Sequence, residues 1–206
     1  MKKRDVYKKA LLLAVPMMIQ NGITNAVGLV DNVMVGSLGT EAMTGVSIVG
    51  QLFFVLSLAV FGGLSGPGIY GAQYYGKGDM EGVRNTFRIK LWVGAFCAIL
   101  GGIVLSALAA PLIQLYLRGE SAGMDSAGTL EFGMQYLQIM LLTIIPFAIT
   151  QVYASSLRET GDSFKPMVAG VISVVVDIVM NYILIYGKLG MPTLGVRGAA
   201  IATVMA

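Results

Sequence analysis

The chain has 206 residues, a formal net charge of +3, one cysteine and no histidine. Only 12% of its residues are charged and 56% are hydrophobic, whereas a soluble domain carries about a quarter charged residues. The composition therefore excludes an ordinary soluble domain and indicates a membrane protein. The lack of histidine excludes histidine-based zinc sites and catalytic triads within the chain, and the lone Cys97 excludes an intrachain disulfide.

Apolar segments long enough to cross a membrane recur along the chain. A helix needs about 20 apolar residues to span the hydrocarbon core. Five complete segments meet this length, at 10–36, 44–72, 91–117, 131–156 and 166–187. A sixth begins near Gly198 and is still apolar at Ala206, so we expect the sequence to be part of a longer protein. The pattern predicts an all-α, polytopic membrane protein with five full spans and the start of a sixth.

The basic residues predict how these spans are oriented. Eleven of the 14 Lys and Arg residues fall at the N-terminus or in the predicted loops after the second and fourth spans. The second-span loop is expected to carry Lys77, Arg84, Arg88 and Lys90. Because cytoplasmic loops are enriched in Lys and Arg, the N-terminus is predicted to be cytoplasmic. Residues 1–9, 76–90 and 157–165 should then share one face of the bundle, with Gly119–Thr129 on the other. The basic balance thus implies no nucleic-acid partner.

Asp31 lies near the end of the first span. A carboxylate at membrane depth is costly, so its default interpretation is a role in an ion or substrate pathway. On an α-helix the polar residues around it fall within an arc of roughly 140°, and the opposite face is apolar. These residues are Gln20, Asn21, Thr24, Asn25, Asp31 and Asn32. The pattern predicts the wall of a transport cavity.

The fifth span holds a second membrane acid, Asp177. Ser173, Asp177 and Asn181 recur every four residues and share a stripe about 80° wide. A structural role in gluing helices together is the alternative, although such contacts contribute only about 0.6 kcal/mol on average. A functional role is favoured for both acids. Thr203, in the sixth span, is a weaker candidate on its own.

The remaining spans carry less specific patterns. One face of the fourth span presents Gln135, Thr143, Pro146, Thr150 and Tyr153, which fits either a cavity lining or helix–helix hydrogen bonding. Pro16 and Pro146 lie inside spans and are expected to kink or loosen them, because proline removes a backbone donor. Gly62 and Gly66 form a G-x-x-x-G pair that predicts a close approach of two helix backbones.

Several motifs in chain order resemble the multidrug and toxic compound extrusion (MATE) transporters. The first is Val15-Pro16-Met17 through Val30-Asp31-Asn32-Val33-Met34-Val35-Gly36. The next are Gln73-Tyr74-Tyr75-Gly76-Lys77-Gly78-Asp79 and Arg158-Glu159-Thr160-Gly161-Asp162. Asn181-Tyr182-Ile183-Leu184-Ile185 and Gly198-Ala199-Ala200-Ile201-Ala202-Thr203 complete the series. Together the motifs cover essentially the whole chain.

The resemblance implies a fold and a function. Such transporters have twelve spans in two six-helix lobes, so residues 1–206 are expected to form most of the N-terminal lobe, with the C-terminal lobe lying outside this sequence. They export small organic, often cationic, compounds by alternating access. The process is driven by inward H⁺ or Na⁺, without a cofactor and without enzyme activity. A multi-pass protein of the bacterial plasma membrane is implied, with the lipid bilayer, a monovalent cation and the C-terminal lobe as partners.

The resemblance also assigns residues. The coupling-ion site matches Asp31, Asp177, Asn181 and Thr203, and the proline that bends the first span matches Pro16. Many relatives carry Asn at the position of Asp177, so this chain has an additional carboxylate. Gln20, Asn21, Thr24, Asn25, Gln135 and Tyr153 are the expected cavity-lining residues.

Two rival functions remain open at this point. A lipid-linked-oligosaccharide flippase of related fold would have similar hydropathy, but it is expected to need more cationic residues in its cavity. An intramembrane enzyme would have to work with an aspartyl pair, since the chain has no histidine.

Overall fold

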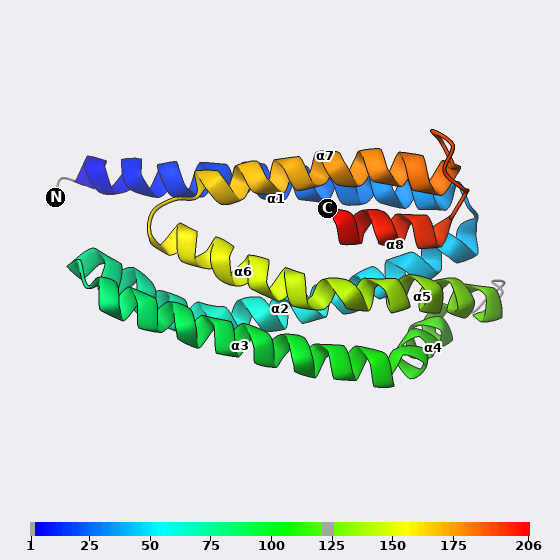
Figure 1. Cartoon of the computed structure of the whole chain (residues 1–206), viewed down its shortest axis with the longest axis horizontal. Helices are drawn as coiled ribbons and strands as arrows, with labels where there is room; N and C mark the ends of the chain where they lie inside the picture. Colours follow the sequence, from blue (N-terminus) through cyan, green and yellow to red (C-terminus); the bar gives the residue numbers. More distant parts are fainter. Residues whose placement is uncertain (1–2, 121–125) are drawn as a thin grey trace.

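The computed structural model describes residues 3–120 and 126–206, and within these ranges every regular element is helical (Figure 1). Four of the elements are long helices of 34, 38, 28 and 23 residues, and the others are shorter. In chain order the elements are α1 (Lys3–Gly36), α2 (Thr40–Lys77), α3 (Met80–Ala107), α4 (Ala109–Glu120), α5 (Ser126–Met140), the 3₁₀ turn η1 (Leu141–Thr143), α6 (Ile144–Glu159), α7 (Phe164–Tyr186) and α8 (Val196–Met205).

Five segments are long and apolar enough to cross a membrane, as the sequence predicted. Four of them are α1 from residue 11, α2, α3 and α7, and the fifth is the continuous run Ser126–Glu159, which comprises α5, η1 and α6. The short apolar helix α8 corresponds to the start of the sixth span. The all-helical membrane fold is therefore confirmed.

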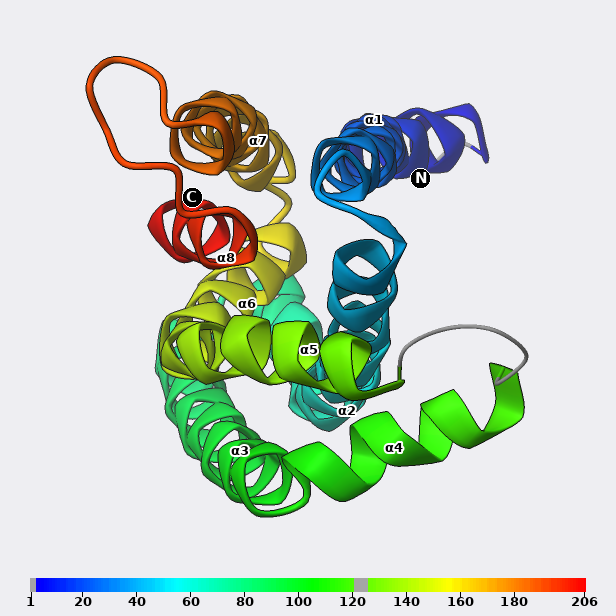
Figure 2. The ribbon, with the colours of Figure 1, turned by 90° about the vertical axis from the view of Figure 1, so that its right-hand side faces the viewer.

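The predicted third span, 91–117, is wrong in its boundaries. The membrane-spanning helix is α3, which begins eleven residues earlier and ends at Ala107. A separate helix, α4, follows and turns away across the end of the bundle (Figure 2). Pro111 explains the break, because it has no N–H to donate to the carbonyl of Ala107 and its ring would clash there. The hydropathy of the sequence does not reveal this interruption, because α4 is itself apolar on one side, where Ile113 and Leu117 are buried.

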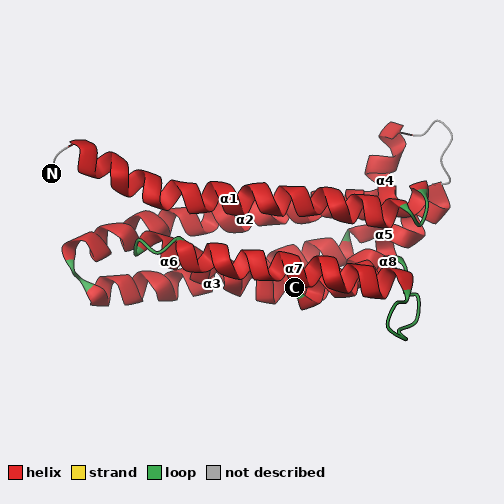
Figure 3. Ribbon diagram, turned by 90° about the horizontal axis from the view of Figure 1, so that it is seen from above, coloured by secondary structure: helices red, strands yellow, loops and turns green. Residues whose placement is uncertain are grey.

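The helices form two adjoining groups. α1 packs along α7, whereas α2 packs against α3, α5 and α6 (Figures 1 and 3). α8 contacts both α7 and α5 and so connects the two groups. The core is made of aliphatic side chains such as Val49, Val60, Leu137 and Val152, each almost fully buried.

The basic segments lie together at one end of the bundle. The start of α1, the turn from α2 to α3 and the turn from α6 to α7 all lie at the left of Figure 1, while α4 and the start of α5 lie at the opposite end. This is the arrangement expected for residues 1–9, 76–90 and 157–165, although 1–2 are outside the described residues. Of the segment Gly119–Thr129, residues 121–125 are also outside them. That the basic end is cytoplasmic stays a prediction.

The two prolines that were predicted to kink or loosen their spans behave differently. α1 continues as one helix through Pro16, so a hinge there stays a prediction. Before Pro146 the fourth span tightens into the turn η1, and the Thr143 hydroxyl donates to the carbonyl of Met140 over 2.6 Å. Since Pro146 cannot donate to the carbonyl of Leu142, the regular α-helical hydrogen bonding is interrupted before this proline, as a tightened turn rather than as the loosening that was predicted.

The glycine pair predicted for helix packing is wrong. A Cβ added at Gly62 or Gly66 would meet no atom within 4 Å. One close approach on α2 occurs instead at Gly45, where a Cβ would lie 2.7 and 2.8 Å from backbone atoms of Thr129 and Gly133 on α5. Others occur at Gly68 and Gly71, where a Cβ would lie 2.6 and 2.7 Å from the carboxylate oxygens of Glu159. The glycines of α2 therefore admit both the backbone of α5 and a charged side chain of α6.

Candidate functional site: a buried acidic cluster

Asp31 is held by a residue of the fifth span. Asn181 donates from Nδ2 to Oδ1 of Asp31 over 2.9 Å, which joins α7 to α1. Asn181 is 1% exposed, and Asp31 is half-buried. The α-helical spacing of four residues places Asp177 one turn before Asn181 on the same face. Packing of α1 along α7 then brings both acids to the same site.

Asp177 completes an acidic pair with Asp31. Its carboxyl group interacts with the Asp31 side chain and with Thr203 of α8, and it is only 8% exposed. Thr203 also donates to the carbonyl of Ala199 within its own helix over 3.1 Å. The four residues expected at a coupling-ion site thus lie together, from three helices.

Tyr136 belongs to the same cluster and was missed in the sequence. It lies on α5, is 8% exposed, and its hydroxyl is within hydrogen-bonding reach of Thr203. Tyrosine in membrane helices is common at the membrane–water interface, so the residue type alone did not predict that Tyr136 is buried. The sequence pattern indicated the neighbouring Gln135 instead, whose side chain leaves the helix about 100° away from that of Tyr136.

Two oxygens of the cluster have no partner. Oδ1 of Asp177 and Oδ1 of Asn181 are buried and accept no hydrogen bond from any residue that the structure describes. Buried polar atoms are nearly always satisfied, so unpaired acceptors beside two carboxylates require an explanation. Carboxylate, amide and hydroxyl oxygens are the donors that hard cations prefer. The cluster fits a proton or a small hard cation, and no group of three or more acidic, Cys or His residues suited to a metal occurs among the described residues.

The polar residues predicted to line a cavity on the first span divide into an exposed group and one residue, Gln20, that bonds to other helices. Asn21, Thr24 and Asn25 are exposed on this chain, as an open cavity wall requires, and the Thr24 hydroxyl donates to the carbonyl of Gln20. Gln20 is engaged inside the lobe. Its Nε2 donates to the carbonyl of Pro166 over 3.4 Å and its Oε1 accepts from Arg158 over 3.2 Å. Gln20 therefore links α1 to α7 and α6.

The two cavity candidates of the fourth span lie apart from the cluster. Nε2 of Gln135 donates to Glu131 of the same helix over 3.0 Å. Tyr153 is 54% exposed and packs edge-on against Phe87 of α3, with ring centroids 5.1 Å apart. The structure does not bring either residue to Asp31 or Asp177.

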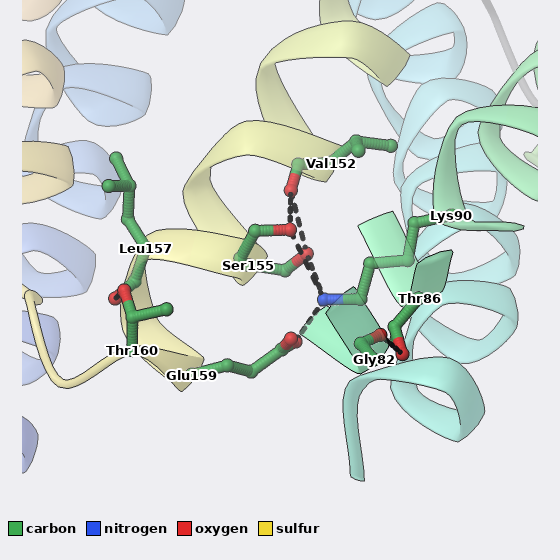
Figure 4. Close-up of polar contacts among 9 residues, drawn as sticks. Gly82, Thr86, Lys90, Val152, Ser155, Leu157, Glu159 and Thr160 are labelled. Carbon is green, nitrogen blue, oxygen red and sulfur yellow. Dashed lines mark hydrogen bonds and ion pairs between the residues drawn. The ribbon is translucent and has the colours of Figure 1, made fainter. Parts of the chain in front are cut away.

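A buried ion pair also escaped the sequence analysis. Lys90, expected in a loop, lies on α3 and is fully buried, where its Nζ pairs with Glu159 of α6 (Figure 4). Nζ also donates to the hydroxyls of Ser155 and Ser156 over 3.3 and 3.4 Å. Both serines donate in turn to the carbonyl of Val152. The pair neutralises a lysine inside the bundle and ties α3 to α6.

The sequence matches a family model and is similar to known multidrug resistance proteins. The family model MatE matches residues 16–183, which is most of the chain. The chain is 30% identical over 204 residues to a probable multidrug resistance protein NorM of Thermotoga maritima, covering 98% of this chain and 42% of the relative. It is 31% identical to the multidrug resistance protein PmpM of Pseudomonas aeruginosa, covering 97% and 40%.

A solved structure agrees with the sequence comparisons. An outward-facing multidrug resistance MATE family transporter of the MOP superfamily superposes with a TM-score of 0.78 at 27% identity, covering 96% of this chain and 42% of that one. The chain thus spans about 40% of the length of the proteins it matches. Because the family model covers more than half of the sequence and the helical fold agrees, the chain belongs to the MatE family of multi-pass membrane transporters.

Proposed function

We propose that the protein containing this chain is a cation-coupled antiporter that exports small organic, often cationic, compounds by alternating access. The two relatives compared above are named as multidrug resistance proteins, which supports organic compounds as the exported class. The observation that carries the proposal is the buried pair Asp31 and Asp177, with unpaired oxygens beside it.

The acidic pair is the proposed binding site of the driving ion. Two ionised carboxylates repel each other, and burial adds the cost of removing their hydration. An H⁺ or Na⁺ relieves both penalties, with Asn181 and Thr203 supplying further oxygen atoms. Binding of the cation therefore favours the arrangement in which α1, α7 and α8 lie close together. We propose no cofactor besides this transported ion.

The coupling is a competition between conformations. A ligand shifts an equilibrium only by its difference in affinity for the two states. If the cation favours the arrangement with α1, α7 and α8 closely packed and the organic substrate favours a more open one, each weakens the binding of the other. The exposed Asn21, Thr24 and Asn25 are the proposed cavity-lining residues, and Pro16 is the proposed bending point of α1.

The location proposed for the protein follows from its charges. Positive residues cluster at the end of the bundle that contains the start of α1, so this end is proposed to face the cytoplasm of a bacterial cell. The C-terminal lobe of the longer chain is the proposed structural partner, and it would complete the cavity. Neither lobe alone is expected to transport.

The two rival functions are weakened by different observations. Members of the MatE family are transporters, so the intramembrane enzyme is excluded. A flippase for a pyrophosphate-linked lipid would need free cationic charge within the lobe. Among the described residues Lys90 is fully buried and Glu159 neutralises it, while the half-buried Arg158 donates to Gln20 at the basic end of the bundle. The acidic cluster favours a cationic rather than an anionic cargo.

The test is ion-driven efflux by the full-length protein in sealed proteoliposomes. A fluorescent organic cation is loaded, and an inward Na⁺ gradient or an inward H⁺ gradient is imposed separately. Efflux that is accelerated by one gradient and abolished by its ionophore is expected. Efflux that is indifferent to both gradients would contradict cation coupling, and translocation of a lipid-linked oligosaccharide in the same vesicles would favour the flippase.

A further inference from the structure

A long apolar groove lies on the outer side of α3 and α6. It has a volume of about 490 Å³ and is lined by residues of these two helices alone. Its floor is made of small or buried residues, including Gly94, Ala98 and Ala148, and its walls include the exposed Ile99 and Ile145. The absence of long side chains on the floor is what leaves the groove open. Because α3 and α6 belong to candidate membrane spans, we expect a groove on their outer side to face the lipid.

The groove lies away from the acidic cluster. The α6 residue Arg158 reaches Gln20 of α1 and so marks the face of α6 that looks into the lobe. The groove uses the opposite face, which carries Ile145, Ile149 and Val152. In Figure 1, α3 forms the edge of the bundle farthest from α1 and α7. A ligand in this groove would therefore occupy a site distinct from the one proposed for cation coupling.

Arg88 provides a charge at one end of the groove. Its side chain is exposed and lines the groove, and it forms no ion pair with any residue that the structure describes. The nearby acid Glu159 is already paired with Lys90. Trp92 follows one turn later and is 79% exposed. Tryptophan prefers the level of the lipid headgroups, so the pair Arg88 and Trp92 marks a membrane boundary.

The length of α3 gives the position of this membrane boundary independently. From Arg88 to the end of α3 at Ala107 the helix rises about 28 Å, close to the roughly 30 Å thickness of the hydrocarbon core. Arg88 therefore lies at one surface of the core when Ala107 lies at the other. From Arg88 to Ile99 the groove extends about 16 Å, which is close to the roughly 15 Å depth of one leaflet.

We propose that this groove binds an anionic phospholipid of the leaflet at the basic end of the bundle. The phosphate group lies against Arg88, and one acyl chain lies along the groove to the level of Ile99. Anionic lipids are concentrated in the cytoplasmic leaflet, which is the leaflet expected at this end. The unpaired cation, the apolar surface and the length of one leaflet together distinguish a phospholipid from a second protein surface.

The test uses the full-length protein in vesicles of equal parts phosphatidylglycerol and phosphatidylcholine. Native mass spectrometry after gentle release measures which lipids remain bound. Arg88→Gln removes the charge, and Ala95→Leu fills the groove from an exposed position. Arg84→Gln is the charge control, one turn earlier on α3, and Ala107→Leu is the matched volume control outside the groove. Thermal unfolding of each variant checks that the fold is retained.

The expected result separates charge from volume. Arg88→Gln lowers the ratio of bound phosphatidylglycerol to phosphatidylcholine about fivefold, the factor expected for loss of one basic residue at the membrane surface. Ala95→Leu lowers the occupancy of both lipids, and the two controls change neither quantity. An unchanged ratio in Arg88→Gln, or an equal loss in Arg84→Gln, would overturn the proposal. It would also be overturned if Ala95→Leu altered oligomeric state or stability rather than lipid occupancy, because the groove would then be covered by protein.

Discussion

Asn181 and Asp31 are joined by a hydrogen bond of 2.9 Å although 150 residues separate them in sequence. The bond fixes the orientation of one carboxylate oxygen of Asp31. The second acid of the site, Asp177, lies one turn before Asn181 on the same face of α7. An amide side chain at position 31 could still accept this hydrogen bond, whereas it could not bind a cation through a negative charge. The structural and the functional contributions of Asp31 are therefore separable.

Asp31→Asn should abolish ion-driven efflux while leaving the protein folded. Loss of the negative charge removes cation affinity, and each 1.4 kcal/mol lost is a factor of ten in binding. We expect efflux driven by an ion gradient to fall by at least about tenfold, measured in proteoliposomes containing equal amounts of full-length protein. Ser106→Ala serves as the control, because among the described residues that exposed hydroxyl bonds to the carbonyl of Ile103 in its own helix and to no other helix. Efflux at the normal rate in Asp31→Asn would contradict the coupling mechanism.

Asp177→Asn should have a smaller effect on rate and a larger one on ion preference. The substitution leaves a single carboxylate, so the repulsion between the two acids disappears. One remaining charge is enough for a proton or Na⁺, and efflux should persist. The ratio of Na⁺-driven to H⁺-driven efflux should change, because the number of charged oxygens at the site has changed. An unchanged ratio, with full activity under both gradients, would place Asp177 outside the ion site.

Much of the acidic cluster was predictable because its signals are local. A carboxylate deep in an apolar segment is unusual by itself, and the spacing of Asp177 and Asn181 requires only the helical repeat. That Asp31 contacts these residues depends on α1 packing along α7, which the periodicity did not reveal. Tyr136 was missed for the same reason, since its role follows from its contact with Thr203 on another helix.

The Lys90–Glu159 pair shows a second reason why part of the structure could not be predicted from the sequence. Both residues lie near the ends of apolar segments, where charge is expected to be solvated in a loop. Burial of Lys90 becomes possible only because α3 begins at Met80 and because α2 offers no side chain at Gly68 and Gly71. These conditions belong to three helices at once. Hydropathy along a single segment cannot report them.

Breaking the Lys90–Glu159 pair from one side should destabilise the protein more than replacing both partners. Glu159→Leu leaves Lys90 buried without its counter-charge, and such losses cost about 3–5 kcal/mol. The double variant Lys90→Met, Glu159→Leu removes both charges and should recover much of this loss. The apparent unfolding temperature of the full-length protein in detergent is the measurement. Asp162→Asn is the control, because its partner Lys165 is 73% exposed and exposed pairs contribute about 1 kcal/mol or less.

The same measurement decides whether the pair is a coupled unit. If the double variant unfolds at a lower temperature than Glu159→Leu alone, the two side chains act independently, and the buried pair is not what ties α3 to α6. A value between those of Glu159→Leu and the unmodified protein is expected, because residues in direct contact show interaction energies of about 0.5–3 kcal/mol.

The glycines beside Glu159 should be intolerant of even one added carbon. Gly68→Ala would place a Cβ 2.6 Å from a carboxylate oxygen and 3.8 Å from Nζ of Lys90. Glu159 would have to move out of its contact with Lys90, and we expect a loss of stability comparable to overpacking, about 1–3 kcal/mol. Gly62→Ala is the matched control on the same helix, where a Cβ meets nothing within 4 Å. Alanine there should be neutral or stabilising by up to about 1 kcal/mol, because glycine weakens a helix.

Thermal unfolding of the two glycine variants in the full-length protein, compared at equal concentration, distinguishes the causes. A drop for Gly68→Ala but not for Gly62→Ala assigns the cost to the crowded carboxylate rather than to a general property of α2. Combining Gly68→Ala with Glu159→Gln should not restore stability, because the amide has nearly the same volume as the carboxylate. Combining it with Glu159→Ala should relieve the contact but leave Lys90 unpaired. Equal stability of Gly68→Ala and the unmodified protein would show that Glu159 can leave this contact at little cost, and the tight packing of α2, α3 and α6 around it would not be needed for the fold.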